Sequence, residues 1–104
     1  MRVRFLPAAE AELREAVALY ETARSGVGQR FLEVVDSRLQ VICRYPERFE
    51  RLAIRRLRQE IRRALILKRF PYSIIFRVEE QEIVVIAVAH AKRRPRYWRK
   101  RLNK

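Results

Sequence analysis

The residues best suited to chemistry gather toward the carboxyl end of the chain. The single histidine, His90, is followed by Tyr97 and by a run of cations that contains no acid. Metal-free cleavage of RNA needs a group that takes the 2′-hydroxyl proton, a donor for the leaving oxygen and cations for the phosphate. His90 and Tyr97 have side chains for the first two roles, and Arg93, Arg94 and Arg62 have them for the third. A nuclease site is therefore one hypothesis for this segment.

The same residues also have a structural interpretation. A histidine that ends a buried strand is commonly a hydrogen-bonded structural residue, and Tyr97 and Trp98 can close the edge of a core instead of stacking on bases. A basic run can be a solvated face or a disordered end, but disordered tails are poor in aromatic residues. Trp98 therefore argues against a wholly disordered end. We expect only about Leu102 to Lys104 to form a free tail.

Other chemistries find little support in the sequence. The single histidine and the single cysteine, Cys43, cannot supply the ligands of a structural zinc site. Both glycines lie in SGVG, residues 25–28, so there is no glycine-rich phosphate loop. Ser73, His90 and a glutamate would make a triad that lacks the strand–turn–helix elbow of such serines. We predict no metal site and no cofactor.

Positive charge is concentrated in the second half of the chain. Residues 1–50 hold eight basic and eight acidic side chains, whereas residues 51–104 hold 17 basic and four acidic ones, so the net charge of +13 belongs to the second half. Such asymmetry predicts an anionic partner, either nucleic acid or an acidic protein segment. The predicted basic face comprises Arg62, Arg63, Lys68, Arg69, Arg77, Lys92, Arg93, Arg94, Arg96 and Arg99.

Length and composition predict one domain over residues 1–104. With 49% hydrophobic residues, the chain can bury a core without disulfides or metal. One cysteine cannot form an internal disulfide, which fits a reducing compartment, and the charged start MRVRFLPAAEAEL is unlike a signal peptide. No stretch approaches the ~20 apolar residues of a membrane span. We therefore expect a cytoplasmic protein without a membrane partner.

Periodicity predicts the elements of the first half. Residues 1–6 alternate between apolar and charged and predict a short strand. Two amphipathic helices follow, from Pro7 to about Arg24 and from about Gly28 to Arg44, and SGVG separates them. The expected buried stripes are Ala9, Leu13, Ala16, Val17 and Tyr20, then Phe31, Leu32, Val35, Leu39 and Ile42. The short connection predicts an antiparallel helical hairpin.

The second half has the patterns of strands. YPERFE, residues 45–50, is expected to be a loop, and residues 51–59 show no clear period. A strand is expected from about Glu60 to Arg69, and YSIIFRV and IVVIAVAH predict two more, joined by the charged turn EEQE. In the first of these strands, Ile61, Leu65 and Leu67 alternate with Arg62, Ala64 and Ile66. Because IVVIAVAH has no polar face, it is expected inside the sheet. A short basic segment with helical potential ends the chain.

The ordered set of these motifs resembles the RelE/ParE superfamily of bacterial type II toxins. In the second half, the resemblance is carried by an arginine-bearing strand, FPY, the short acidic turn, AVAH and RPRYW. In the first half, VRFLPAAEAEL, GVGQRFLEVV and YPERF agree in layout. The resemblance covers nearly the whole chain, and the ordered set is more specific than any single motif.

This resemblance implies both a fold and a partner. The fold is a small α+β domain in which a helical hairpin packs on a four-stranded, mostly antiparallel sheet, built from the N-terminal strand and a three-stranded meander. The function implied is that of the toxin in a toxin–antitoxin or plasmid-stabilisation system. The partner is a cognate antitoxin whose acidic C-terminal segment wraps the toxin in a hetero-oligomer, and the charge asymmetry suits such a partner.

The superfamily divides by target. RelE-like members cleave mRNA in the ribosome with sheet arginines and lysines and a C-terminal tyrosine or histidine, whereas ParE-like members lack that set and poison DNA gyrase. Tyr97 matches the C-terminal aromatic and Arg93 or Arg94 a phosphate-binding arginine, but Ser73 stands where the nucleases carry an arginine. Loss of one charge-stabilising group at a reaction centre costs about 10²–10³ in rate. We therefore favour a gyrase poison over an mRNA endoribonuclease, with a basic nucleic-acid-binding module as the third hypothesis.

Overall fold

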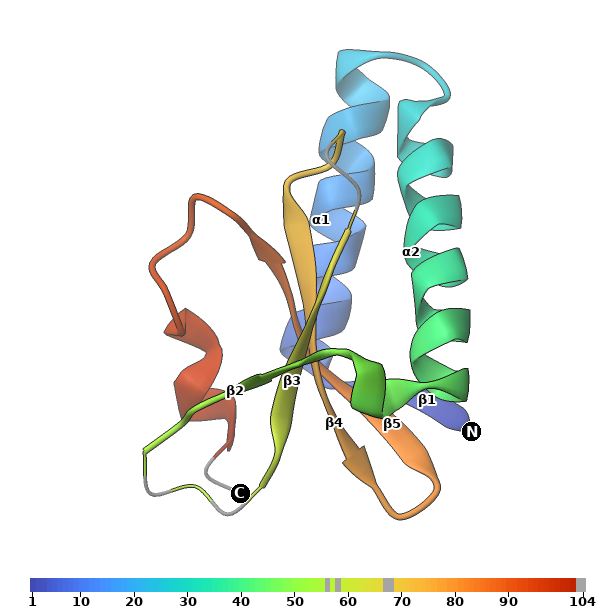
Figure 1. Cartoon of the computed structure of the whole chain (residues 1–104). Coiled ribbons are helices and arrows are strands. Elements are labelled where there is room, and N and C mark those ends of the chain that lie inside the picture. The colour runs from blue at the N-terminus through green and yellow to red at the C-terminus, as the bar shows by residue number, and fades with distance from the viewer. Residues whose placement is uncertain (56, 58, 67–68, 103–104) are drawn as a thin grey trace.

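A mixed sheet lies between two helical layers in the computed structural model, which describes residues 1–55, 57, 59–66 and 69–102. The sheet has five strands in the order β1-β5-β4-β3-β2. The helices α1 (Pro7–Ala23) and α2 (Val27–Arg44) cover one face, and the short 3-10 helix η2 (Tyr97–Leu102) covers the other (Figure 1). The predicted α+β class and the predicted helical hairpin are confirmed.

The sheet is antiparallel except at one edge. β3 (Ile61–Leu65), β4 (Tyr72–Glu79) and β5 (Glu82–His90) form the predicted meander. β1 (Arg2–Phe5) pairs with β5 in parallel, and β2 (Glu50–Leu52) adds an antiparallel edge strand beside β3. The prediction of four strands was therefore wrong by one.

The additional strand β2 begins at Glu50, the last residue of the predicted loop, and continues into residues 51–59, for which the sequence shows no clear period. Pro46 begins a one-turn 3-10 helix, η1 (Pro46–Arg48), and the strand starts two residues after it. Glu50 lies opposite Arg63, and the carboxylate of Glu50 pairs with the guanidinium of Arg63 at 2.8 Å. A short strand held by a cross-strand ion pair has no hydrophobic alternation, so periodicity does not reveal it.

Glu21 fastens the connection between the helices. The backbone N–H groups of Gly26 and Gly28 donate to the Glu21 carboxylate at 2.9 and 3.0 Å, where a negative charge also suits the N-terminus of α2. Gly26 has a φ of 91°, which favours glycine. At Gly28 the helices approach closely, since a Cβ there would lie 2.5 Å from the carbonyl oxygen of Val17. Both glycines are thus used in making the hairpin.

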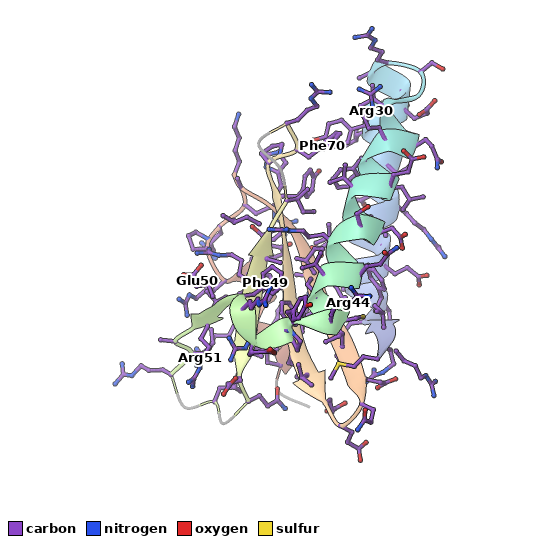
Figure 2. The ribbon with its side chains drawn as sticks, turned by 45° about the vertical axis from the view of Figure 1, so that its right-hand side comes forward. Arg30, Arg44, Phe49, Glu50, Arg51 and Phe70 are labelled. Atoms are coloured by element: carbon purple, nitrogen blue, oxygen red, sulfur yellow. The ribbon has the colours of Figure 1, made fainter. Side chains whose placement is uncertain are left out.

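The two faces of the sheet carry separate apolar clusters. Between the sheet and the helices, the rings of Phe31 and Phe70 lie 5.1 Å apart, and Figure 2 shows Phe70 at the end of the sheet nearest the start of α2. On the other face, Trp98 and Leu102 cover a smaller cluster that contains Ile61, Ile75, Ile86 and Ala87. Every side chain from Ile83 to Val88 is at most 2% exposed, which confirms β5 as the predicted interior strand.

Two predicted side-chain positions were wrong, those of Leu32 and Leu102. Leu65 shares a face of β3 with Ile61, as the alternation predicted, but is 61% exposed because it lies outside the cluster that Trp98 and Leu102 cover. Leu32 is 38% exposed, because the core contacts on its turn of α2 are made by the neighbouring Phe31. Leu102 was expected in a free tail, yet it is 3% exposed and closes the smaller cluster. Leu67 lies outside the described residues.

Candidate functional site

A groove of about 230 Å³ runs between the sheet and the segment that leads into η2. Antiparallel pairing brings the start of β4 beside the end of β5, with Ser73 opposite Ala89. The chain then turns back over the sheet, because the Ala91 N–H donates to the Pro71 carbonyl at 2.7 Å and Trp98 is buried. The groove gathers these predicted residues: Arg63, Ser73, His90, Arg93, Arg94, Arg96 and Tyr97.

The two walls of the groove differ in charge. On the sheet side, the charge of Arg63 is offset by Glu50, which also lines the groove, and Ser73 is neutral. On the other side, Arg93, Arg94 and Arg96 have no acidic residue within their own segment. The positive potential of the groove therefore comes from the segment after β5 and not from the sheet.

His90 holds the turn at the end of β5. Its Nδ1 accepts a hydrogen bond from the backbone N–H of Lys92 at 3.0 Å. The His90 and Tyr72 rings make a T-shaped contact at a centroid distance of 4.9 Å, and the His90 carbonyl accepts from the Arg93 N–H at 3.0 Å. These contacts match the structural interpretation of His90.

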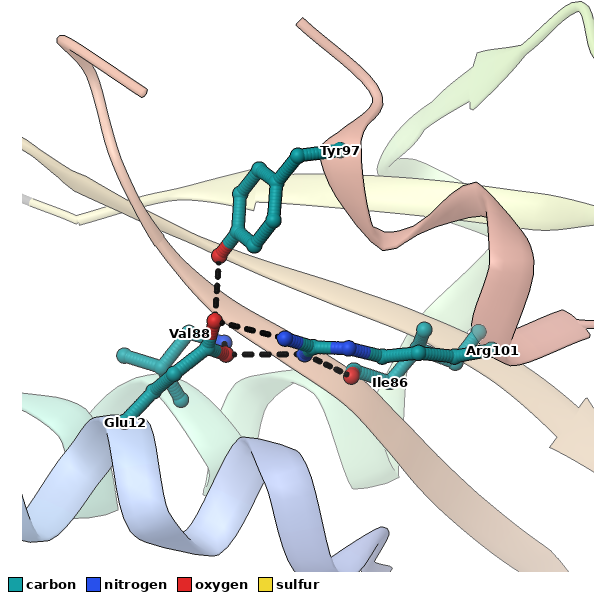
Figure 3. A network of polar contacts seen from close by, with 5 residues as sticks. All are labelled: Glu12, Ile86, Val88, Tyr97 and Arg101. Carbon is teal, nitrogen blue, oxygen red and sulfur yellow. Dashed lines mark hydrogen bonds and ion pairs between the residues drawn. The ribbon is translucent and has the colours of Figure 1, made fainter. Parts of the chain in front are cut away.

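Tyr97 belongs to a network that ties η2 to α1 (Figure 3). Its hydroxyl donates to Oε2 of Glu12 at 2.6 Å. Arg101 donates to both carboxylate oxygens of Glu12, at 3.0 and 2.9 Å. Side-chain exposures of 17% for Arg101 and 12% for Glu12 place this pair mostly away from water. One carboxylate thus anchors two side chains of the C-terminal helix.

The network also completes the open edge of β5. β1 ends at Phe5, and the Leu6 N–H makes the last contact, to the Val85 carbonyl at 2.9 Å. Beyond it, the Val88 N–H donates to Glu12 at 3.0 Å, and the Ile86 carbonyl accepts from Arg101 at 2.9 Å (Figure 3). Buried backbone groups without partners are costly, so the pair replaces the missing strand.

Burial and hydrogen bonding in this network shift the pKa values of Tyr97, Glu12 and Arg101. Burial raises the pKa of the Tyr97 hydroxyl far above its ordinary value of 10.0, and the hydrogen bond to Glu12 raises it further. Burial alone would raise the pKa of Glu12, but hydrogen bonds from Arg101, Tyr97 and Val88 outweigh it and lower that pKa. The hydrogen bond to Glu12 raises the pKa of Arg101 despite burial. Tyr97 therefore keeps its proton at neutral pH.

Arg62 does not join the other predicted catalytic residues. Adjacent residues of a strand point to opposite faces, so Arg62 turns away from the side on which Arg63 lines the groove. Its guanidinium donates to the carbonyls of Phe49 and Glu47 at 2.6 and 3.2 Å and pairs with Glu60 at 2.8 Å. Arg62 therefore braces β3 against the chain before β2, and the predicted grouping with Arg93 and Arg94 does not form.

The remaining members of the predicted basic face are dispersed. Arg77 has a side chain 13% exposed and pairs with Glu79 at 3.5 Å, near the β4–β5 turn. Arg69 is exposed in the connection between β3 and β4, and Lys92 is exposed in the turn after β5. Lys68 lies outside the described residues. The basic face is thus narrower than the sequence predicted.

A second, larger hollow adjoins the groove. It has a volume of about 620 Å³ and is lined by Tyr97 and by six cations, Arg93, Arg94, Arg96, Arg99, Lys100 and Arg101. Arg93 stacks on the Tyr97 ring, with its guanidinium carbon 3.8 Å from the ring centroid. Arg96 donates to the carbonyl of Ala53, and Arg99 donates to that of Arg55 at 2.7 Å. The hollow is therefore built from cations that the fold holds in place.

Two residues of the network escaped the sequence analysis. Glu12 follows Ala9 by three positions and precedes Ala16 by four, and both alanines are buried. An acid on the apolar face of a helix is a signal that could have singled it out. Arg101 has no such signal, because it is one cation in a basic run.

Within the described part of the chain, no three His, Cys, Asp or Glu side chains are grouped so that they could hold a metal ion. None of its described helices is long and apolar enough to cross a membrane.

The sheet, the hairpin and the cationic C-terminal groove define a small α+β domain of the RelE/ParE type. Residues 3–95 match the family described as "ParE toxin of type II toxin-antitoxin system, parDE", and the chain belongs to this ParE toxin family. The predicted family is thereby confirmed.

A solved structure shares the fold. The structure titled "Chromosomal ParDE TA system from P. aeruginosa" superposes with a TM-score of 0.71 and 16% sequence identity, covering 88% of this chain and 97% of that one. At this identity the likeness concerns the fold alone. A comparison with curated proteins finds no match.

Proposed function

We propose that this ParE-family toxin inhibits growth by poisoning DNA gyrase and that a cognate antitoxin neutralises it. The observation that carries the proposal is the neutral sheet side of the groove. Ser73 lines this side and stands where the mRNA-cleaving, RelE-like members of the superfamily carry an arginine. The charge of Arg63 on the same side is offset by Glu50. A phosphodiester in the groove would lack cations on one side, and loss of such a group costs orders of magnitude in rate.

The two candidate proton carriers support binding over catalysis. The hydroxyl of Tyr97 is engaged by Glu12, and its raised pKa opposes a role as general base. Nδ1 of His90 is engaged by the Lys92 N–H. A site whose acid–base groups are used in structural hydrogen bonds suits a protein that acts by holding its target.

The positive charge of the groove supports neutralisation of the toxin by an acidic antitoxin segment. Arg93, Arg94 and Arg96 line the groove from one side, and an acidic segment of the antitoxin that covers them would block the groove. Opposite charges also speed the encounter of the two proteins. We therefore propose that antitoxin and target compete for this face in a toxin–antitoxin hetero-oligomer.

The test is a gyrase assay with the purified full chain, relaxed plasmid and ATP. We expect loss of supercoiling and accumulation of linear plasmid after detergent treatment, because a poison traps the cleaved DNA complex. Addition of the antitoxin encoded beside the toxin should restore supercoiling. Unchanged supercoiling with toxin in excess over gyrase would contradict the proposal.

The nuclease alternative is tested separately by mapping mRNA 5′ ends after toxin induction. We expect no new codon-linked ends. If such ends appeared and were lost in Tyr97→Phe, the protein would be a ribosome-dependent endoribonuclease and the gyrase proposal would fail.

A further inference from the structure

The cations of the chain are divided into paired and unpaired sets. Away from the C-terminus, arginines such as Arg4, Arg14 and Arg77 form ion pairs with glutamates. Among the six cations of the hollow, only Arg101 forms an ion pair within the part of the chain that the structure describes, and its partner is Glu12. The hollow therefore concentrates positive charge that, among the described residues, only Glu12 offsets through an ion pair.

Neutral contacts hold these cations in place. Arg96 and Arg99 donate to backbone carbonyls of the segment after β2, which orient a guanidinium without cancelling its charge. Arg93 lies against the ring of Tyr97, whose hydroxyl is fixed by Glu12. Arg94 and Lys100 are exposed at the rim. Because Arg93, Arg96 and Arg99 are held in place before binding, an anionic ligand would lose little of their side-chain entropy.

The chemistry of the lining selects among anionic ligands. Protein partners gain most of their binding energy from apolar and aromatic anchors that fill pockets. The hollow offers no aliphatic side chain, and Tyr97 is its single aromatic lining residue among those described. Phosphate groups need no such anchor, because their binding is driven by charge and counterion release. The lining therefore fits a phosphate backbone.

The ring of Tyr97 distinguishes a duplex from a single strand. Proteins that bind unpaired nucleic acid stack its bases on open aromatic faces. Here the guanidinium carbons of Arg93 and Arg101 lie 3.8 and 5.3 Å from the Tyr97 ring centroid, so the ring is already stacked with cations. Without a free stacking platform, the hollow suits the outside of a duplex, where the bases are stacked inside and the phosphates face the protein.

We propose that the hollow binds the phosphate backbone of duplex DNA, so that the toxin contacts the DNA held by gyrase as well as the enzyme. The inference rests on the proposed function for its choice of DNA over other duplexes. Contact with both components would let the toxin bind the DNA-bound enzyme more tightly than free gyrase. Two weak contacts on one assembly reinforce each other in this way.

Binding of a fluorescein-labelled duplex of arbitrary sequence, followed by anisotropy over a range of salt, tests the surface. The test variant is Arg94→Glu with Lys100→Glu, both exposed and without ion pairs among the described residues. The control is Arg24→Glu with Arg30→Glu, which changes net charge equally at exposed positions of the hairpin (Figure 2 labels Arg30). Circular dichroism should show that both variants are folded.

We expect the test variant to weaken duplex binding at least about tenfold at low salt and to reduce the slope of log K against log salt by about 2. The control should stay within about threefold of the unmodified chain, since it leaves the hollow unchanged. Equal losses of duplex affinity in both variants would show that net charge alone causes the effect, and this would overturn the proposal. Unaltered binding in the test variant, or tighter binding of single-stranded RNA than of the duplex, would also overturn it.

The gyrase assay separates this inference from the function on which it rests. If the control variant poisons gyrase and the test variant does not, both proposals are supported. If the test variant loses duplex binding but poisons gyrase fully, the DNA contact is overturned and the proposed function stands. If the unmodified chain binds duplex through the hollow yet leaves gyrase active, the DNA-binding surface is supported and the proposed function fails.

Discussion

Glu12 is the residue on which the C-terminal segment depends. Its carboxylate accepts hydrogen bonds from the Tyr97 hydroxyl, the Arg101 guanidinium and the Val88 N–H. Four bonds to one mostly buried carboxylate, including two from Arg101, satisfy nearly all of its lone pairs. Tyr97 is thereby an anchor in this structure, and its catalytic role remains an untested hypothesis.

Replacement of Glu12 by glutamine should destabilise the protein by about 2–4 kcal/mol, because Arg101 would keep a mostly buried charge without its counter-charge. Tyr97→Phe removes only one charge-assisted hydrogen bond and should cost less, about 1–2 kcal/mol. Urea unfolding monitored by circular dichroism measures both. Glu10→Gln on the same helix, at an exposed i,i+4 pair with Arg14, is the control and should change stability by less than about 0.5 kcal/mol. Equal effects at Glu10 and Glu12 would contradict the role of Glu12 as the counter-charge of Arg101.

The same carboxylate should make stability depend on acid. Because the pKa of Glu12 is lowered in the folded protein below its ordinary 4.5, the unfolded chain binds more protons as the pH falls. The stabilisation is therefore complete above pH 4.5 and is lost progressively as the pH falls through the lowered folded pKa. Urea midpoints from about pH 6 to about pH 3 should fall less steeply for Glu12→Gln than for the unmodified chain. Parallel curves would exclude Glu12 as the cause.

At the scale of elements, β1 is too short to cover the whole of β5. β1 covers only the first part of β5, and a bulge falls just beyond, where Ile75 pairs with Ala87 while Phe76 pairs with Val85. The backbone groups exposed there are satisfied by Glu12 and Arg101. η2 therefore contributes polar partners to the sheet edge together with apolar cover for the sheet face.

The apolar contribution of η2 should be large. Trp98→Ala is expected to destabilise the protein by about 3–5 kcal/mol, because the 3% exposed indole closes the cluster over Ile75 and Ile86 and its loss leaves a cavity. Thermal and urea unfolding measure the change. Lys100→Ala on the exposed side of the same helix should be nearly neutral. Similar stability of the two variants would mean that η2 does not pack as described.

At the scale of the whole molecule, the sheet separates the side that carries the helices from the side that carries the cationic hollow (Figure 1). The helical side holds the larger core, and on its outer surface Arg14 pairs with Glu10. The opposite side carries the smaller core and the cationic hollow. The acids of the chain lie mostly in its first half, so folding does not bring them to the hollow, apart from Glu12. This division leaves one surface free for anionic partners.

The sequence by itself determined the helices, the meander and the burial of β5, because these depend on local spacing of apolar residues. It also determined that Arg93, Arg94 and Arg96 would lie together, since six cations occupy one segment of nine residues around them. Motif order was sufficient for the family. Local pattern was insufficient for β2, whose strand depends on a cross-strand ion pair.

Only the tertiary structure decided the roles of the individual side chains. Arg62 and Arg63 are neighbours in sequence, yet the alternation of a strand sends them to opposite faces. Glu12 and Arg101 are 89 residues apart, and they meet because η2 folds back over the end of β5 beside α1. Whether Tyr97 is an anchor or a free phenol depends on that meeting. Contacts between distant segments set the environment of a titratable group, and local sequence does not contain them.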